Sequence, residues 1–96
     1  MYTVAALYHF TPFEDVAALQ DPLRDACEAG GVVGTLLLAP EGINGTIAGP
    51  RAGIDAALAH IRALPGCSDL EWKESTAAAR PFKKLKVRLK LSLIHI

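Results

Sequence analysis

Residues 32–49 read VVGTLLLAPEGINGTIAG, and the apolar runs at the two ends of this stretch predict neighbouring β-strands. The first run is continuous and bounded by turn residues, which is typical of a buried central strand. Asn44-Gly45 is the strongest short hairpin signal, because both residues accept positive φ at low cost. The stretch therefore predicts an antiparallel hairpin that turns at Asn44-Gly45.

The segment before this hairpin predicts a strand followed by a helix. Residues 3–10 form a β-branched and aromatic run of strand length. Residues 11–14, TPFE, resemble a capping box with proline at the first helical position, and Gly30-Gly31 ends the helical pattern that follows. Asp21-Pro22 interrupts this pattern. Either a turn precedes a helix that begins near Asp21, or Pro22 kinks a longer helix.

The segment after the hairpin predicts a second helix and two more strands. Gly49-Pro50 opens a stretch whose apolar residues recur at spacings of three and four, and Pro65-Gly66 ends it. Residues 70–75 alternate like a strand. Residues 83–90, KKLKVRLK, place leucine and valine on one face and four cations on the other. A slip of one residue would bury those cations, so the register is well determined.

The predicted order is β-α-β-β-α-β with one extra basic strand at the C-terminal end. This is the ferredoxin-like order of the α+β class, which acylphosphatase-like domains share. It predicts an antiparallel sheet with both helices on one face, which leaves the other face for solvent or a partner. The 96 residues suffice for one domain, which we place at residues 1–90. We interpret residues 91–96, LSLIHI, as an artificial tail or a truncated end, with an authentic short terminus as the alternative.

Composition excludes several classes of protein. No apolar run approaches the roughly 20 residues that span a bilayer, and the N-terminus lacks the basic region of a signal peptide, so we expect no membrane partner. Cys27 and Cys67 have no metal-ligand or CxxC spacing, and we expect free thiols in a reducing compartment, the cytoplasm. We predict no metal site and no cofactor.

The charge is balanced in total but not along the chain. All ten acidic residues lie within residues 1–75, whereas six of the ten basic residues lie within residues 76–96. This asymmetry indicates an anionic partner for the C-terminal part. The candidate RNA-binding residues lie on or beside the last strand: Arg80, Lys83, Lys84, Lys86, Arg88 and Lys90. Cations repeating about every 6.6 Å along a strand can follow a phosphate backbone, but a solvated edge strand that resists aggregation has the same pattern.

The aromatic and histidine side chains are further candidates, and those of the first strand have two interpretations. Tyr8 and Phe10 share one face of the first strand, where they stack RNA bases if that face is open, or pack in the core. We expect core packing for at least one of them. His9 is expected to be polar at a strand end, His60 to be solvated, and Trp72 to pack over the sheet edge.

Three strings in order, LLLAPEGINGTIAG (36–49), WKES (72–75) and PFKKLKVRLK (81–90), resemble the N-terminal domain of the rhodanese-containing tRNA uridine hydroxylases, formerly labelled rhodanese-related sulfurtransferases. The resemblance covers roughly residues 3–90. It implies an acylphosphatase-like or ferredoxin-like domain that precedes a rhodanese domain. It also implies a parent enzyme that uses oxygen to form 5-hydroxyuridine at the tRNA wobble position.

The same resemblance implies that this domain is not catalytic by itself, because the family's catalytic cysteine lies in the rhodanese domain. Neither Cys27 nor Cys67 lies in a rhodanese-type loop. An acylphosphatase activity is not expected either, because the loop after the first strand, HFTPFED, is acidic and lacks the required arginine.

The resemblance makes tRNA and the downstream rhodanese domain the expected partners. Two hypotheses follow: a domain that positions tRNA, and a scaffold that only docks on the rhodanese domain. A continuous basic face favours the first, and a broad apolar patch beside residues 40–45 favours the second. The candidate contact loop consists of Glu41, Gly42, Asn44 and Gly45, for which turn geometry alone is the alternative.

Overall fold

Five strands and two helices follow one another in the predicted order. The computed structural model describes residues 1–90, so the predicted tail, residues 91–96, lies outside the described residues. The elements are β1 (Tyr2–Phe10), α1 (Val16–Ala29), β2 (Val33–Ala39), β3 (Gly42–Gly49), α2 (Arg51–Arg62), β4 (Trp72–Ala77) and β5 (Leu85–Leu89). Neither of these helices is long and apolar enough to cross a membrane.

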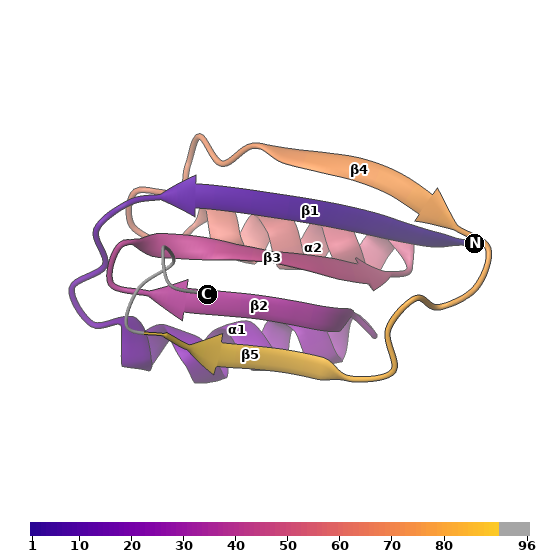
Figure 1. Cartoon of the computed structure of the whole chain (residues 1–96), viewed down its shortest axis with the longest axis horizontal. Coiled ribbons are helices and arrows are strands. Elements are labelled where there is room, and N and C mark those ends of the chain that lie inside the picture. Colours follow the sequence, from indigo (N-terminus) through magenta and orange to yellow (C-terminus); the bar gives the residue numbers. More distant parts are fainter. Residues whose placement is uncertain (91–96) are drawn as a thin grey trace.

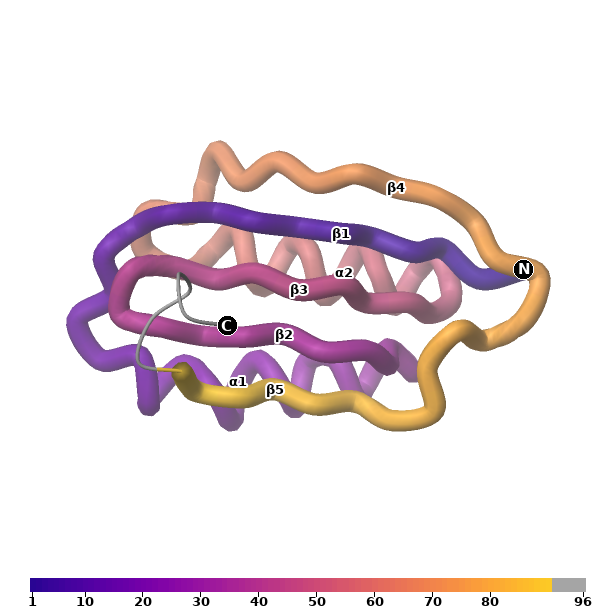
Figure 2. The backbone as a smooth tube through the Cα atoms, viewed as in Figure 1, coloured from indigo at the N-terminus to yellow at the C-terminus, as the bar shows by residue number. Residues whose placement is uncertain are grey.

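The strands form one sheet in the order β4-β1-β3-β2-β5, and both helices cover the same face of it (Figure 1). The first four strands pair antiparallel, which confirms the ferredoxin-like fold. β5 pairs with β2 in parallel and makes the sheet mixed, a pairing that the sequence analysis does not predict. Residues 78–84 carry the chain from β4 at one edge to β5 at the opposite edge (Figure 2).

The hairpin turns at Pro40-Glu41, so the prediction of a turn at Asn44-Gly45 is wrong. Ala39 pairs with Gly42 across the turn, and Asn44-Gly45 lies inside β3. Proline cannot donate to the ladder of a strand that is paired on both sides, whereas its fixed φ suits the first turn position. No residue other than glycine has positive φ among residues 1–90, which excludes the mirrored turn types that Asn-Gly favours.

The two glycines of β3 serve close strand contact instead of a turn. Gly42 and Gly45 have φ of 153° and 152°, a region that is nearly restricted to glycine. A Cβ atom at Gly45 would overlap the carbonyl oxygen of Thr35 on β2, and one at Gly42 would overlap that of His9 on β1. These residues therefore let β3 fit between two neighbours.

α1 begins at Val16 and not at the predicted capping box. The backbone amides of Thr11 and Phe13 donate to the carbonyls of Glu41 and Pro40, so residues 11–13 lie against the hairpin turn and do not start a helix. Asp15 caps the helix, since its side chain accepts a hydrogen bond of 3.4 Å from the amide of Ala18.

α1 continues through Pro22 as one helix, which excludes a helix that begins near Asp21 and agrees with the longer helix of the second alternative. Its end matches the predicted Gly30-Gly31 stop. Gly31 has φ of 70°, and the amide of Val32 donates to the carbonyl of Cys27, as in a Schellman motif.

The core lies between the sheet and the helices, and α1 also secures the edge strand. The large side chains that are fully buried in this core are Leu23, Leu36, Leu38, Ile43, Ile47, Ile54 and Ile61. Gln20 of α1 donates a hydrogen bond of 2.7 Å to the carbonyl of Val87, the central residue of β5. This bond satisfies a carbonyl that would otherwise be open for edge-to-edge pairing.

Candidate nucleic-acid interface

The sheet face opposite the helices, here called the open face, carries Tyr8 and Phe10, two of the three aromatic residues of β1. Ala5 and Leu7 alternate with them and are buried beneath the helices. Tyr8 and Phe10 are 51% and 56% exposed, so the prediction that at least one packs in the core is wrong. Their rings meet edge to face with centroids 4.8 Å apart. They form an exposed aromatic pair. Single exposed hydrophobic residues are common on protein surfaces, whereas adjacent ones indicate a binding site.

The cations of β5 lie on this same open face. Val87 points into the core, so by alternation Lys84, Lys86 and Arg88 point the other way, and all three are exposed. Lys86 pairs with Thr35 of β2 and Arg88 with Leu37. The structure thus brings the predicted cationic row to the edge of the open face.

The cations of β5 differ from most other basic side chains in having no partner. Arg24 pairs with Asp21, Arg51 pairs with Glu74, and Arg62 lies 5.9 Å from the Trp72 ring. Within residues 1–90, the structure gives the side chains of Lys84, Lys86 and Arg88 no acidic or hydrogen-bond partner. Their charges are therefore available to an external anion.

Arg80 and Lys83, which flank the predicted row, are placed differently. The guanidinium of Arg80 donates hydrogen bonds to the carbonyls of Phe82 and Lys83, at 3.0 and 2.8 Å, and so braces the loop before β5. Lys83 lines a depression of about 380 Å³ together with Thr35, Phe82, Lys84 and Lys86. At the other end of the row, the Lys90 amide donates to the Leu38 carbonyl at 2.8 Å, which extends the pairing of β5.

The register aligns side chains of the open face in rows across the strands. Tyr8 pairs with Asn44, Asn44 with Leu37, and Leu37 with Arg88. In the next row, the small residues Ala6, Thr46 and Thr35 lead to Lys86. Sequence reasoning missed Asn44 as a residue of this face; the signal that identifies it is Pro40, which fixes the turn four residues earlier.

The predicted contact loop is not a single loop. Glu41 lies in the turn, Gly42 begins β3, and Asn44-Gly45 lies deep in the sheet. Around the turn, a depression is lined by Phe10, Thr11, Pro12, Pro40 and Glu41. Phe10 and the two prolines thus place apolar groups beside residues 40–41, where the docking hypothesis expects an apolar patch.

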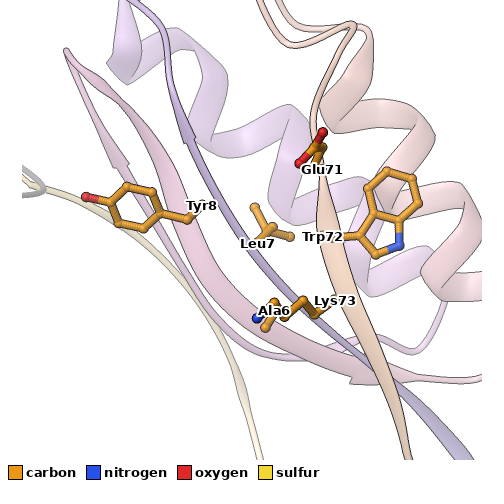
Figure 3. A pocket seen from close by; sticks show the side chains of 6 residues that line it. All are labelled: Ala6, Leu7, Tyr8, Glu71, Trp72 and Lys73. Atoms are coloured by element: carbon orange, nitrogen blue, oxygen red, sulfur yellow. The ribbon is translucent and has the colours of Figure 1, made fainter.

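A third hollow, of about 360 Å³, lies between β1 and β4 and is lined by Ala6, Leu7, Tyr8, Glu71, Trp72 and Lys73 (Figure 3). The Tyr8 ring extends from β1 toward β3, away from β4. Trp72 of the edge strand β4 is half-buried against the core, so it packs at the sheet edge as predicted. Its Nε1 donates a hydrogen bond of 2.9 Å to Glu74.

The two histidines within residues 1–90 lie away from the cationic row. His9 ends β1 as a polar residue, as predicted, and Nε2 lies 2.8 Å from the carbonyl of Gly66, to which it donates. His60 is only half-exposed, and its Nε2 is buried with no hydrogen-bond partner in the described part of the chain. The prediction of a solvated His60 is therefore wrong for this atom.

Both thiols are buried and free, including Cys67, which lies in the loop after α2. Burial, with a smaller contribution from Glu28, raises the pKa of Cys27 to about 11. Burial, with a contribution from Asp69, also raises the pKa of Cys67. Both side chains are therefore protonated at neutral pH, which makes them poor nucleophiles. Among residues 1–90, no three histidine, cysteine or acidic side chains gather as a metal site would require.

We predict that neither thiol reacts with Ellman's reagent in the folded protein at about pH 8, because both sulfur atoms are buried and protonated. Two thiols per chain should react once urea unfolds the protein. The absorbance of the released thionitrobenzoate measures both numbers. Rapid reaction of either thiol without urea would show that its burial is wrong.

Solved structures with this fold include the BLUF protein BlrB in its dark state, with a TM-score of 0.67 and 22% identity, covering 92% of this chain and 70% of that one. They also include the Klebsiella pneumoniae BlrP1 calcium/cyclic-diGMP complex at pH 8.0, with a TM-score of 0.68 and 20% identity, covering 95% of this chain and 24% of that one. At this identity these likenesses show the fold alone.

Curated relatives are much more similar in sequence. The chain is 73% identical over its whole length to a tRNA uridine(34) hydroxylase of Jannaschia sp. (strain CCS1), of which it covers 32%. It is 72% identical to one of Ruegeria pomeroyi, with 98% of this chain and 31% of that protein covered. It therefore spans about a third of the length of these relatives. Residues 2–93 match the UPF0176 acylphosphatase-like domain, and the chain belongs to this family.

Proposed function

We propose that this chain is the N-terminal, tRNA-contacting domain of a tRNA uridine(34) hydroxylase and is not catalytic by itself. The names of its relatives support the parent activity, which we expect to be oxygen-dependent formation of 5-hydroxyuridine. The observation that carries the RNA role is the unpartnered row of Lys84, Lys86 and Arg88 at the edge of the open face. tRNA as substrate implies a cytoplasmic location.

The distribution of charge supports RNA contact on the open face and not on the helices. On the opposite side of the molecule, α1 carries the exposed acidic side chains of Asp21, Asp25 and Glu28 and one basic side chain, Arg24, so this helix is net negative. Phosphates are repelled there and attracted by the β5 cations. Electrostatic steering of this kind orients a polyanion before close contacts form. The tRNA backbone is therefore expected to run along β5.

We assign no catalytic residue to this domain. Both thiols are buried, and their raised pKa values disfavour the thiolate that nucleophilic chemistry needs. We expect the reaction chemistry in a downstream rhodanese domain of the parent chain, with this domain holding the tRNA. Under this proposal the domain contributes affinity and orientation, which supply part of the rate enhancement of a bimolecular reaction.

A second candidate function is docking onto the rhodanese domain without RNA contact. It is favoured by the depression around Pro40-Glu41, where Phe10 is 56% exposed beside Pro12. Exposed apolar surface of this kind is typical of a protein contact. The two functions depend on different side chains, the cations of the β5 edge and the apolar groups around Pro40, and are therefore separable by substitution.

Titration of labelled tRNA with this chain between about 50 and 200 mM KCl tests the proposal. Three phosphate contacts predict that log K falls with log salt at a slope of about −2 to −3, because each contact releases a condensed cation. Fluorescence anisotropy measures this slope. Negligible binding at the lowest salt would contradict the RNA role and leave docking as the function.

A further inference from the structure

Asn44 is a polar side chain in an unusual position. It lies in the central strand β3, half-buried on the open face, between Tyr8 of β1 and Leu37 of β2. Within residues 1–90, the structure gives its amide no hydrogen-bond partner. Neither polar atom of this amide is fully buried, so both remain open to a hydrogen-bonding group from outside the chain. Asparagine is also a poor strand former, so packing and propensity do not account for it.

The neighbours of Asn44 provide the other parts of a nucleotide site. On one side the ring of Tyr8 is exposed, with Phe10 fixed against it edge to face and the small side chain of Ala6 beyond it along β1. On the other side, two strands away and thus about 10 Å at the backbone, lies Arg88. One row therefore offers an aromatic ring, a donor-acceptor amide and a guanidinium.

We propose that Tyr8 and Asn44 bind one unstacked base of a single-stranded RNA loop. Tyr8 stacks on the base, and the Asn44 amide donates to and accepts from the base edge. Arg88 holds a phosphate of the bound strand. This inference rests on the proposed RNA contact and adds to it a base-binding subsite, distinct from the phosphate contacts of the lysines.

The chemistry of the row favours a single strand over a duplex. Bases in an RNA duplex are stacked on each other and present no face to an aromatic side chain, whereas loop bases can turn out onto a sheet. Every base can stack on an aromatic ring. The amide has both a hydrogen-bond donor and an acceptor, so it complements the edges of more than one base. The site is therefore expected to select unpaired bases more strongly than base identity.

Binding of fluorescein-labelled heptauridylate tests this subsite, with a matched strand that carries abasic sites at its central positions. We expect Tyr8→Leu to weaken heptauridylate binding by about 5- to 150-fold, the range for loss of one base-aromatic stack. Tyr8→Phe keeps the ring and should stay within about twofold. Asn44→Ala should weaken binding by about fivefold, the loss of one hydrogen bond. Tyr2→Leu, at the other end of β1, is the matched control and should leave affinity unchanged.

The abasic strand separates the two kinds of contact. It should bind the unaltered chain and the Tyr8→Leu chain equally, because only phosphate contacts remain. Equal binding of heptauridylate by the Tyr8→Leu, Asn44→Ala and unaltered chains would overturn the base site while leaving the phosphate contacts in place. Absence of any RNA binding by the unaltered chain would overturn the base site together with the proposed function.

Discussion

Alanine in place of Gly45 should prevent this chain from reaching its native fold. Gly45 has φ of 152°, and its added Cβ would overlap the Thr35 carbonyl oxygen and lie 2.9 Å from the Leu36 Cα. Strained φ costs about 1–3 kcal/mol and an overpacked contact a similar amount. Because β3 is paired on both sides, it cannot move away from β2 without losing its bonds to β1. The summed cost approaches the whole stability of a small domain, about 5 kcal/mol.

Circular dichroism and urea unfolding measure this effect. The control is Thr46→Ala, the next residue of β3, which is half-exposed on the open face. Its cost should be about 1 kcal/mol or less, because no core contact is removed. A Gly45→Ala chain that unfolds cooperatively, within about 1 kcal/mol of the unaltered protein, would show that the close approach of β2 and β3 is wrong.

Simultaneous replacement of Lys84, Lys86 and Arg88 by alanine should lower tRNA affinity on the order of 100-fold at about 100 mM salt. Each lost phosphate contact lowers the slope of log K against log salt by about 0.7 to 0.9. Three contacts therefore contribute about 2 in log K between roughly 1 M salt, where counterion release no longer favours binding, and roughly 0.1 M salt. The triple variant should therefore bind more weakly and with less dependence on salt. Anisotropy titrations at several salt concentrations measure both quantities.

The matched control keeps the charge and changes the side chains. Lys84→Arg combined with Lys86→Arg should bind tRNA as the unaltered chain does, because phosphate contact at this edge depends on charge. Thermal unfolding should be similar in all variants, since these exposed residues have no partner within the described residues. Unchanged affinity and unchanged slope in the triple alanine variant would exclude the β5 row from RNA binding.

The sequence predicted most of the fold because hydrophobic alternation is local. Leu85 and Val87 alternate with cations, and this pattern alone places the cations on one face of a strand. The pairing of that strand with β2 in parallel was not predictable in the same way. It depends on which edge of the sheet lies within reach of residues 78–84, which is a property of the folded molecule.

The candidate site was predictable only in part, and the turn explains why. The register of β2 against β3 depends on where the chain turns. The sequence offers two turn positions, one at Asn44-Gly45 and one at Pro40. With the turn at residues 40–41, Asn44 pairs with Leu37 and Tyr8, an alignment that the predicted turn does not produce. The exposure of Tyr8 was ambiguous because its neighbours along β1 are apolar on both faces.

Methyl NMR of the chain during titration with a tRNA anticodon stem-loop tests the role of the open face most directly. We expect the methyl signals of Ala6, Leu37 and Thr46, which face away from the helices, to shift as RNA is added. Those of Leu23 and Ile54, fully buried between sheet and helices, should stay in place. RNA-dependent shifts confined to residues of α1 and α2, with the open-face methyls unmoved, would contradict the account.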